Sequence, residues 1–126
     1  MIYENELICI ELEKSEIPWV KVFTKKEFKE ISDVDDVTRK WLFEAALITE
    51  KTMLDFYCAD KINWASFANY VPKVHIHVQA RFKDDSFFPE SMWGTKQRDG
   101  TKRDLNIEKF TNQLVLNLKN YNFIKK

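Results

Sequence analysis

The sequence predicts a single α+β domain, an antiparallel sheet with one long helix packed across it. Two short segments near the start alternate apolar and polar residues, which is typical of half-buried strands. Residues 34–56 repeat apolar side chains at the 3.6-residue period of an amphipathic helix. Residues 73–82 alternate again, so a further strand follows the helix. A chain of 126 residues can bury the core of one such domain.

The sheet is expected to contain early and late strands, on either side of the long helix in the sequence. The early strands, residues 7–13 and 19–23, are joined by a turn and should pair antiparallel. The late strands, residues 62–69 and 73–82, are separated by Pro72, which has no backbone N–H and interrupts a ladder. We expect these two strands to form a hairpin.

Capping signals predict where the first two helices begin. Thr24 and Glu27 have the spacing of a capping box, which predicts a short helix that stops near Ser32. Ser32 and Asp35 repeat that spacing and predict the start of the long helix, which should end between residues 57 and 60. One face of this helix carries the residues expected against the sheet, namely Val34, Val37, Trp41, Ala45, Ile48, Thr52 and Phe56.

The last third of the sequence predicts a loop and one more helix. Residues 83–103 contain the turn-forming residues of a loop, with enough apolar side chains to pack it down. Trp93 in this loop could close over a site or pin the loop to the core. Residues 106–121 place apolar side chains at helical spacing. The whole chain, residues 1–126, is therefore one domain, with a core of about residues 1–94 and a C-terminal helical extension of about residues 104–121.

Charge and composition exclude several classes of partner. The 20 Lys and Arg residues balance 20 Asp and Glu residues, so no net field attracts nucleic acid or an anionic membrane surface. We find no leader-like segment and no apolar run that could cross a bilayer, so we expect a cytoplasmic protein. Cys9 and Cys58 lie among apolar neighbours in unrelated segments, which indicates two reduced, buried thiols.

Both histidines of the chain lie on one face of the strand predicted over residues 73–82. Successive side chains of a strand point to opposite faces, and one face here is entirely apolar. Imidazole can attack phosphorus and form a covalent intermediate, while cationic and amide groups can stabilise the phosphoryl oxygens. The polar face, which favours such phosphate chemistry, consists of Lys73, His75, His77, Gln79 and Arg81.

Two other interpretations of the histidine pair stay open on the residues alone. The histidines could be ordinary surface residues on an exposed sheet face. They could also bind zinc, but the cysteines have no ligand-type spacing, so the remaining ligands would have to be Asp84, Asp85 or Glu90. We assign no metal ligand.

The segment around the histidines resembles the signature of the histidine triad family. The resemblance covers residues 62–85, with an Asn-x-Val-Pro lead-in at residues 69–72 and an Arg-Phe-Lys-Asp-Asp exit. It continues through Phe-Pro-Glu-Ser-Met-Trp-Gly at residues 88–94, similar to the loop of a bacterial branch of diadenosine polyphosphate hydrolases. Ile-Pro-Trp-Val at residues 17–20 adds weaker support, and the tail from Thr95 lies outside the resemblance.

The resemblance implies roles for the residues that match the family's pattern. His75 falls on the nucleophile that attacks the α-phosphate, and His77 on the histidine that contacts the phosphate or leaving group. Asn69 falls on an asparagine near the phosphate. Lys73 replaces the family's first histidine, which helps to orient the nucleophilic ring by hydrogen bonding, and the lysine side chain has no acceptor for that role. With Lys73, Gln79 and Arg81 from the polar face of the strand, the candidate substrate-binding residues are Asn69, Lys73, Gln79 and Arg81.

The resemblance defines the nucleoside part of the site less closely. An acidic residue holds the ribose in this family, and Glu11 and Glu13 are the candidates in this sequence. A nucleoside also needs a flat apolar slot, whose walls could come from Ile10, Trp19 or Phe28, each equally plausible as a core residue.

The resemblance implies a five-stranded sheet, often a homodimer, and a nucleotide hydrolase or nucleotidyl transferase. The reaction takes place at the α-phosphate of a nucleotide or dinucleoside polyphosphate, through a nucleotidyl-histidine intermediate. No cofactor is required, although Mg²⁺ can accompany a polyphosphate substrate. The alternative is a catalytically weak nucleotide-binding regulatory protein, because Lys73 departs from the triad.

Overall fold

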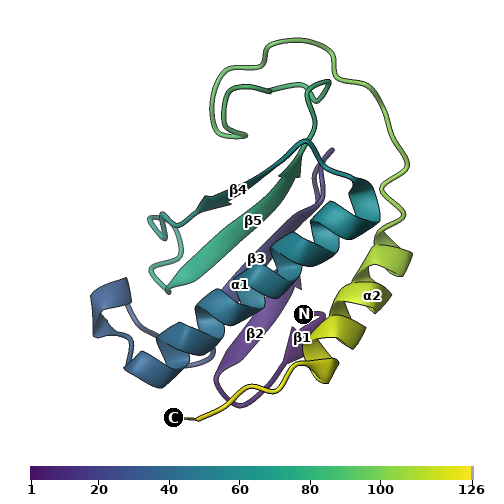
Figure 1. The fold of residues 1–126 in the computed structure, drawn as a ribbon. Helices are drawn as coiled ribbons and strands as arrows, with labels where there is room; N and C mark the ends of the chain where they lie inside the picture. The colour runs from purple at the N-terminus through teal and green to yellow at the C-terminus, as the bar shows by residue number, and fades with distance from the viewer. Residues whose placement is uncertain (126) are drawn as a thin grey trace.

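Five strands form one antiparallel sheet in the order β1-β2-β3-β5-β4 (Figure 1). The structure is a computed structural model that describes residues 1–125. The strands are β1 (Tyr3–Glu4), β2 (Ile8–Leu12), β3 (Trp19–Thr24), β4 (Lys61–Ala65) and β5 (His75–Arg81). The helices are α1 (Asp36–Tyr57) and α2 (Ile107–Asn120), with a single 3-10 turn η1 (Ile31–Asp33) between β3 and α1. The predicted α+β fold with about five strands is confirmed, and β1 is a short strand that the sequence pattern did not reveal.

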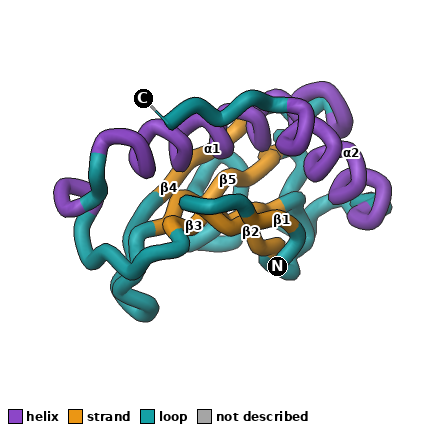
Figure 2. Tube along the Cα trace, turned by 90° about the horizontal axis from the view of Figure 1, so that it is seen from below, coloured by secondary structure: helices purple, strands orange, loops and turns teal. Residues whose placement is uncertain are grey.

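Both helices lie on the same face of the sheet (Figure 2). Helix α1 packs across the central strands, and α2 packs beside α1. Ala45 and Ala46 of α1 are fully buried, and such small residues let the helix approach the sheet closely. The described part of the chain has no helix that is long and apolar enough to cross a membrane. The opposite face of the sheet is covered by no helix of residues 1–125 and lies against loop segments instead.

Antiparallel pairing determines which side chains are neighbours on that open face. Strand β3 pairs with β5 so that Phe23 lies opposite His75 and Lys21 lies opposite His77. Strand β4 pairs with the other edge of β5, which confirms the predicted hairpin. Ile76 of β5 points the other way and is buried in the core. The predicted division of β5 into an apolar and a polar face therefore holds.

The short helix predicted to begin at Thr24 is reduced to the 3-10 turn η1. Thr24 still belongs to β3, and its hydroxyl donates to the carbonyl oxygen of Lys26 at 2.8 Å, so it cannot cap a helix. The residues that do form a capping box are Glu30 and Asp33, at the start of η1. The spacing of Thr24 and Glu27 was misleading because the ladder of β3 already uses the backbone at Thr24.

The cap of the long helix is Asp35 and not Ser32. The Asp35 carboxylate accepts hydrogen bonds from the backbone N–H and the hydroxyl of Thr38, at 3.1 and 2.9 Å. These hydrogen bonds lower the pKa of Asp35. At the other end, Cys58 adopts a left-handed conformation with φ of 51° and is exposed, so the prediction of two buried thiols holds only for Cys9.

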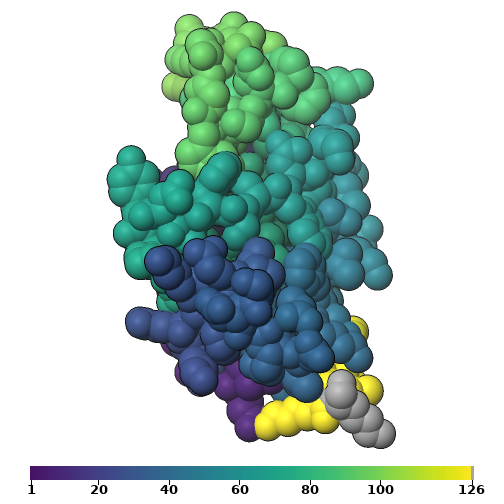
Figure 3. All heavy atoms as spheres, turned by 90° about the vertical axis from the view of Figure 1, so that its left-hand side faces the viewer, coloured from purple at the N-terminus to yellow at the C-terminus, as the bar shows by residue number. Residues whose placement is uncertain are grey.

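The long loop between β5 and α2 is folded into a compact lobe at one end of the sheet, as its apolar content predicts (Figure 3). Its turns are held by Ser86, whose hydroxyl accepts a hydrogen bond from the backbone N–H of Gly100 at 3.0 Å. A Cβ atom at position 100 would lie only 2.6 Å from the backbone nitrogen of Ser86. Glycine is therefore needed at position 100, where the backbone of the loop passes close to Ser86.

Candidate functional site

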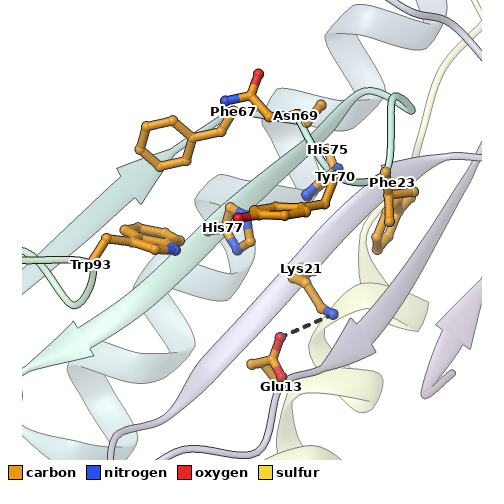
Figure 4. Close-up of a pocket in the computed structure, with 11 residues that line it drawn as sticks. Glu13, Lys21, Phe23, Phe67, Asn69, Tyr70, His75, His77 and Trp93 are labelled. Carbon is orange, nitrogen blue, oxygen red and sulfur yellow. Dashed lines mark ion pairs between the residues drawn. The ribbon is translucent and has the colours of Figure 1, made fainter.

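A cavity of about 430 Å³ opens on the helix-free face of the sheet, over β3 and β5 (Figure 4). We call it the histidine cavity, because His75 and His77 both line it. The other lining residues come from the β2–β3 hairpin, from the segment before β5 and from the long loop. They are Glu13, Lys21, Phe23, Phe67, Ala68, Asn69, Tyr70, Val71 and Trp93.

His75 is held so that one ring nitrogen is available to attack an electrophile. Its Nδ1 lies 2.7 Å from the main-chain carbonyl oxygen of Lys73. Because a carbonyl oxygen can only accept, Nδ1 carries the hydrogen and Nε2 carries the lone pair. The ring is only 6% exposed and stacks on Phe23 with centroids 4.6 Å apart. Hydrogen bond and stacking together fix the tautomer and the plane of the ring.

His77 is fixed in the opposite tautomer. Its Nδ1 accepts a hydrogen bond of 2.9 Å from the indole N–H of Trp19, so the hydrogen of the neutral ring is on Nε2. Burial, and after it the proximity of His75 and Lys21, lowers the pKa of His77 to about 4. His77 is therefore neutral at pH 7 and can donate one hydrogen bond from Nε2 to a ligand.

Replacing Trp19→Phe is expected to raise the pKa of His77 from about 4 towards its ordinary value of 6.5. The indole N–H occupies the lone pair that a proton would take, so its removal makes protonation easier. An NMR titration of the ring C–H signals of His77 measures the change. The control is Trp41→Phe, because the Trp41 indole donates to the carbonyl of Ile124 instead. A pKa of His77 that stays near 4 in Trp19→Phe would show that burial and the neighbouring His75 and Lys21 keep the ring neutral without the indole.

Aromatic side chains wall both ends of the histidine cavity. Trp93 packs edge-on against His77 and against Phe67, with ring centroids 5.0 and 4.9 Å apart. Phe23 lies at the other end, against His75 (Figure 4). Of the two roles predicted for Trp93, the structure thus supports the one at the site. Aromatic walls of this kind accept a planar group such as a nucleobase.

One ion pair lines the cavity. Lys21 Nζ lies 3.3 Å from Glu13 Oε1 (Figure 4). Of the two glutamates considered for the ribose, only Glu13 lines the cavity. None of the residues considered for the walls of a nucleoside slot, Ile10, Trp19 and Phe28, lines the cavity, and all three belong to the core or pack against it.

Several lining residues were not predicted from the sequence. Lys21 and Phe23 are ordinary strand residues by pattern, and only the pairing of β3 with β5 brings them opposite the histidines. Phe67, Tyr70 and Val71 lie in the segment that the sequence assigned partly to a strand. The early alternation of β3 was a usable signal, since it places Lys21 and Phe23 on one face.

The other predicted substrate-binding residues are divided by the structure. Asn69 lines the histidine cavity. Lys73 does not line it, and its Nζ lies 5.5 Å from the centroid of the Phe23 ring. Gln79 and Arg81 follow His77 along the same face of β5 but lie outside the cavity, Gln79 in a neighbouring one.

Arg81 has a structural partner that occupies its guanidinium. Its Nε and Nη2 donate to the two carboxylate oxygens of Asp85 at 2.9 and 3.1 Å, and Nη1 donates to Asn63 Oδ1 at 2.9 Å. The side chains of this bidentate pair are only 1% and 3% exposed. Arg81 therefore anchors the start of the long loop to the sheet.

Asp85 is a carboxylate stabilised in its charged form. Burial by itself would raise its pKa, but hydrogen bonds from Arg81 and from the backbone N–H groups of Phe82, Phe87 and Phe88 outweigh burial. The pKa falls to about 2 as a result.

Two of the acidic residues considered for a zinc site, Asp84 and Asp85, form ion pairs with arginines. Asp85 is paired with Arg81, and Asp84 Oδ1 accepts from Arg103 Nη2 at 2.7 Å. Across residues 1–125, no three His, Cys, Asp or Glu side chains gather closely enough to hold a metal ion.

Comparison with known proteins gives one family throughout. A family model described as the HIT domain matches residues 1–84. A histidine triad protein from Bradyrhizobium japonicum has a similar structure, with a TM-score of 0.76 and 26% identity over 90% of this chain and 85% of that chain. A histidine triad protein from Sinorhizobium meliloti 1021 has a TM-score of 0.74 and 24% identity, over 92% and 87% of the two chains. A third, from Marinobacter aquaeolei VT8, has a TM-score of 0.71 and 22% identity, over 94% and 84%. No curated protein matches this chain.

Proposed function

Because this chain belongs to the HIT domain family, we propose that it hydrolyses or transfers a nucleotidyl group, with His75 as the nucleophile at the α-phosphate. Membership of the family supports a nucleotide-handling role in general. The observation that carries the finer proposal is the hydrogen bond from His75 Nδ1 to the carbonyl of Lys73. It leaves Nε2 with the lone pair that an attack on phosphorus requires.

The reaction proceeds in two displacements at the same phosphorus. Nε2 of His75 forms a bond to the α-phosphorus while the bond to the leaving group breaks, and its electron pair departs with that group. Water then attacks the nucleotidyl-histidine, the N–P bond breaks, and a nucleoside monophosphate is released. The proton that the leaving group takes up is replaced by one that this water gives up. In a transferase, another hydroxyl or amine takes the place of water.

The remaining cavity residues bind the substrate in this proposal. His77 is neutral and donates from Nε2 to a phosphoryl oxygen or to the leaving atom. Asn69 donates its amide to the phosphate, and Glu13 accepts hydrogen bonds from the ribose hydroxyls. The base packs between aromatic walls such as Phe23 and Tyr70. Mg²⁺ is proposed only as a companion of a polyphosphate substrate, and no step requires it.

Lys73 is compatible with the proposed catalysis, because its main-chain carbonyl can orient the ring of His75. The sequence predicted that lysine could not orient the nucleophilic ring, since its side chain has no acceptor. The acceptor is the main-chain carbonyl, which every residue type has. Its position is set by the turn in which the backbone N–H of Lys73 donates to Val71 at 2.7 Å.

Replacing Lys73→Ala is accordingly expected to lower kcat by less than about tenfold, because the carbonyl remains. Lys73→His, which restores a third histidine, is expected to bring no large gain. Steady-state kinetics of both variants measure this. A loss of about a thousandfold in Lys73→Ala would mean that the lysine side chain itself acts in the reaction.

A direct test is to assay the purified protein with AMP, adenosine 5′-phosphoramidate and diadenosine polyphosphates. We expect binding of AMP and release of AMP from the other two compounds. Binding of AMP without any turnover would instead support a nucleotide-binding regulatory protein. Absence of both would contradict the proposal.

A homodimer stays a prediction for this chain. Strand β4 is an edge strand, and Phe43 and Leu47 of the neighbouring helix α1 are partly exposed. An open edge beside apolar side chains is a common setting for self-association. Light scattering on the purified protein determines the molecular mass in solution, and a value near 15.1 kDa would exclude the dimer.

A further inference from the structure

Among residues 1–125, one pair of oppositely charged side chains lines the histidine cavity. Lys21 is the only lysine or arginine of the described chain that lines it, and Glu13 is the only carboxylate. Their charges cancel, and His77 is neutral at pH 7. The proposed substrate nevertheless brings an anionic phosphate to this cavity. Lys21 is therefore the one lining cation that can offset the charge of the phosphate.

Strand pairing places Lys21 beside the proposed phosphate chemistry. In the ladder between β3 and β5, Lys21 lies directly opposite His77, and Phe23 lies opposite His75. Directly paired residues on one face have Cβ atoms about 4.5–5.5 Å apart, which is less than the length of an extended lysine side chain. Figure 4 shows both Lys21 and His77 on the cavity side of the two strands. The Lys21 ammonium can therefore reach a phosphoryl oxygen that His77 contacts.

The Lys21 ammonium is partly shielded from water but keeps an accessible surface. Its side chain is 20% exposed, and its Nζ lies 6.0 Å from the centroid of the Phe23 ring. Burial and His75 are the larger causes of the lowered pKa of His77, and Lys21 is the next. The charge of Lys21 thus acts at the imidazole of His77. A cation in such surroundings attracts an anion more strongly than one in open water.

Glu13 is a partner that a phosphate can replace. Lys21 Nζ and Glu13 Oε1 are 3.3 Å apart, and the Glu13 side chain is 41% exposed. Ion pairs with an exposed member contribute little to stability, because water and salt screen them. A phosphate has several charged acceptor oxygens and can take the ammonium over from one carboxylate. Glu13 is then free to accept from the ribose hydroxyls, the role proposed for it above.

We propose that Lys21 is the phosphate-binding cation of the histidine cavity, and that its ammonium moves from Glu13 to the α-phosphate when a nucleotide binds. This inference rests on the function proposed above. The ammonium pairs with the phosphoryl oxygens while Nε2 of His75 attacks, and it transfers no proton. Lys21 thereby makes the cavity selective for phosphorylated nucleosides over free nucleosides, which offer this cation no anionic group.

The test compares two ligands that differ only in the phosphate. Calorimetry gives the Kd of adenosine and of AMP for the native chain and for Lys21→Met, which removes the charge and keeps an unbranched side chain. We expect the ratio Kd(adenosine)/Kd(AMP) to fall by roughly tenfold in Lys21→Met, as for the loss of a hydrogen bond to a charged group. The ratio should also depend less on salt in this variant. Lys21→Arg keeps the charge and should keep most of the ratio.

The matched control is Lys25→Met. Lys25 Nζ lies 3.3 Å from Glu4 Oε2, the same separation as in the Lys21 pair, but neither Lys25 nor Glu4 lines the cavity. The ratio Kd(adenosine)/Kd(AMP) should therefore stay at its native value in Lys25→Met. A ratio in Lys21→Met that equals the ratio in Lys25→Met overturns the proposal.

Glu13→Gln distinguishes phosphate binding by Lys21 from a role in which Lys21 only positions Glu13. Phosphate binding predicts that the ratio rises in Glu13→Gln, because the ammonium no longer has to leave a carboxylate. This rise should be absent from the double variant Lys21→Met/Glu13→Gln. A positioning role predicts that each single variant weakens the binding of both ligands equally, so an unchanged ratio overturns the proposal.

The same measurements keep the test decisive and separate it from the proposed function. If Lys21→Met does not fold, a ratio that fails to rise in Glu13→Gln overturns the phosphate-binding role. Failure of the native chain to bind AMP at all overturns the proposed function instead. Binding of AMP no tighter than that of adenosine leaves the proposed function standing and overturns only the role of Lys21.

Discussion

Replacing His75→Ala is expected to abolish turnover, with a fall in kcat on the order of 10⁴-fold or more, as for the loss of a catalytic nucleophile. The cavity keeps its walls and the Glu13–Lys21 ion pair, so AMP should still bind. The measurement is the release of AMP from adenosine 5′-phosphoramidate and from a diadenosine polyphosphate. Rapid quenching of the native enzyme should also trap a nucleotide on protein, which this variant cannot form.

The control for His75→Ala is the same substitution at His77. His77 is neutral and offers one hydrogen bond from Nε2, so His77→Ala should lower kcat less, by roughly 10²-fold. The proposal requires that kcat falls further in His75→Ala than in His77→Ala. Equal rates in the native chain and His75→Ala would show that the nucleophile has been assigned wrongly.

Replacing Arg81→Met is expected to destabilise the fold by about 3–5 kcal/mol, the usual cost of removing one partner of a buried ion pair. The carboxylate of Asp85 would remain buried beside the backbone N–H groups of the long loop without its cation. Asn63 would lose its donor as well. Urea unfolding at pH 7 measures the free energy of unfolding.

Two comparisons separate the loss of the buried ion pair from the general effect of replacing an arginine by methionine. Arg39→Met makes the same substitution at an exposed pair with Asp36, and should cost far less. The pH dependence should also change. In the native chain the pKa of Asp85 is about 2, below its ordinary 3.8, so its stabilising effect is present above pH 4 and is lost towards pH 2. The free energy of unfolding that Arg81→Met loses relative to the native chain should be largest at neutral pH. This loss should shrink in acid, where Asp85 becomes protonated. A deficit that does not depend on pH would argue that lost packing, not charge, is responsible.

Periodicity predicted most of the fold. The long helix, the hairpin of β4 and β5 and the final helix all follow from apolar spacing, because each buries one continuous face. Capping motifs predicted the helix starts less well. Thr24 and Glu27 have the spacing of a capping box, but the backbone of Thr24 already belongs to the ladder of β3. β1 has only two residues, too few for any alternation to show.

The site was predictable where one strand carries it and hidden where several segments meet. Alternation along β5 was enough to place His75 and His77 on one face. Arg81 has the same alternation, yet its guanidinium belongs to Asp85, four residues further on in a loop without periodicity. Lys21 and Phe23 depend on the pairing of distant strands. The acceptor that orients the ring of His75 is the main-chain carbonyl oxygen of Lys73, and the type of residue at position 73 does not predict it.

The strict alternation of β5 also separates residues that stabilise the core from residues that line the cavities, within seven positions of one strand. Ile76, Val78 and Ala80 are buried in the core, while His75, His77 and Gln79 face the two cavities. A substitution of His75, His77 or Gln79 changes what lines the cavities and leaves the core packing under α1 intact, whereas a substitution of Ile76, Val78 or Ala80 does the reverse. A single inserted residue would exchange the two sets, with imidazoles in the core and isoleucine in the site. Specificity in this domain can thus evolve by point substitution along β5, but not by changes in its length.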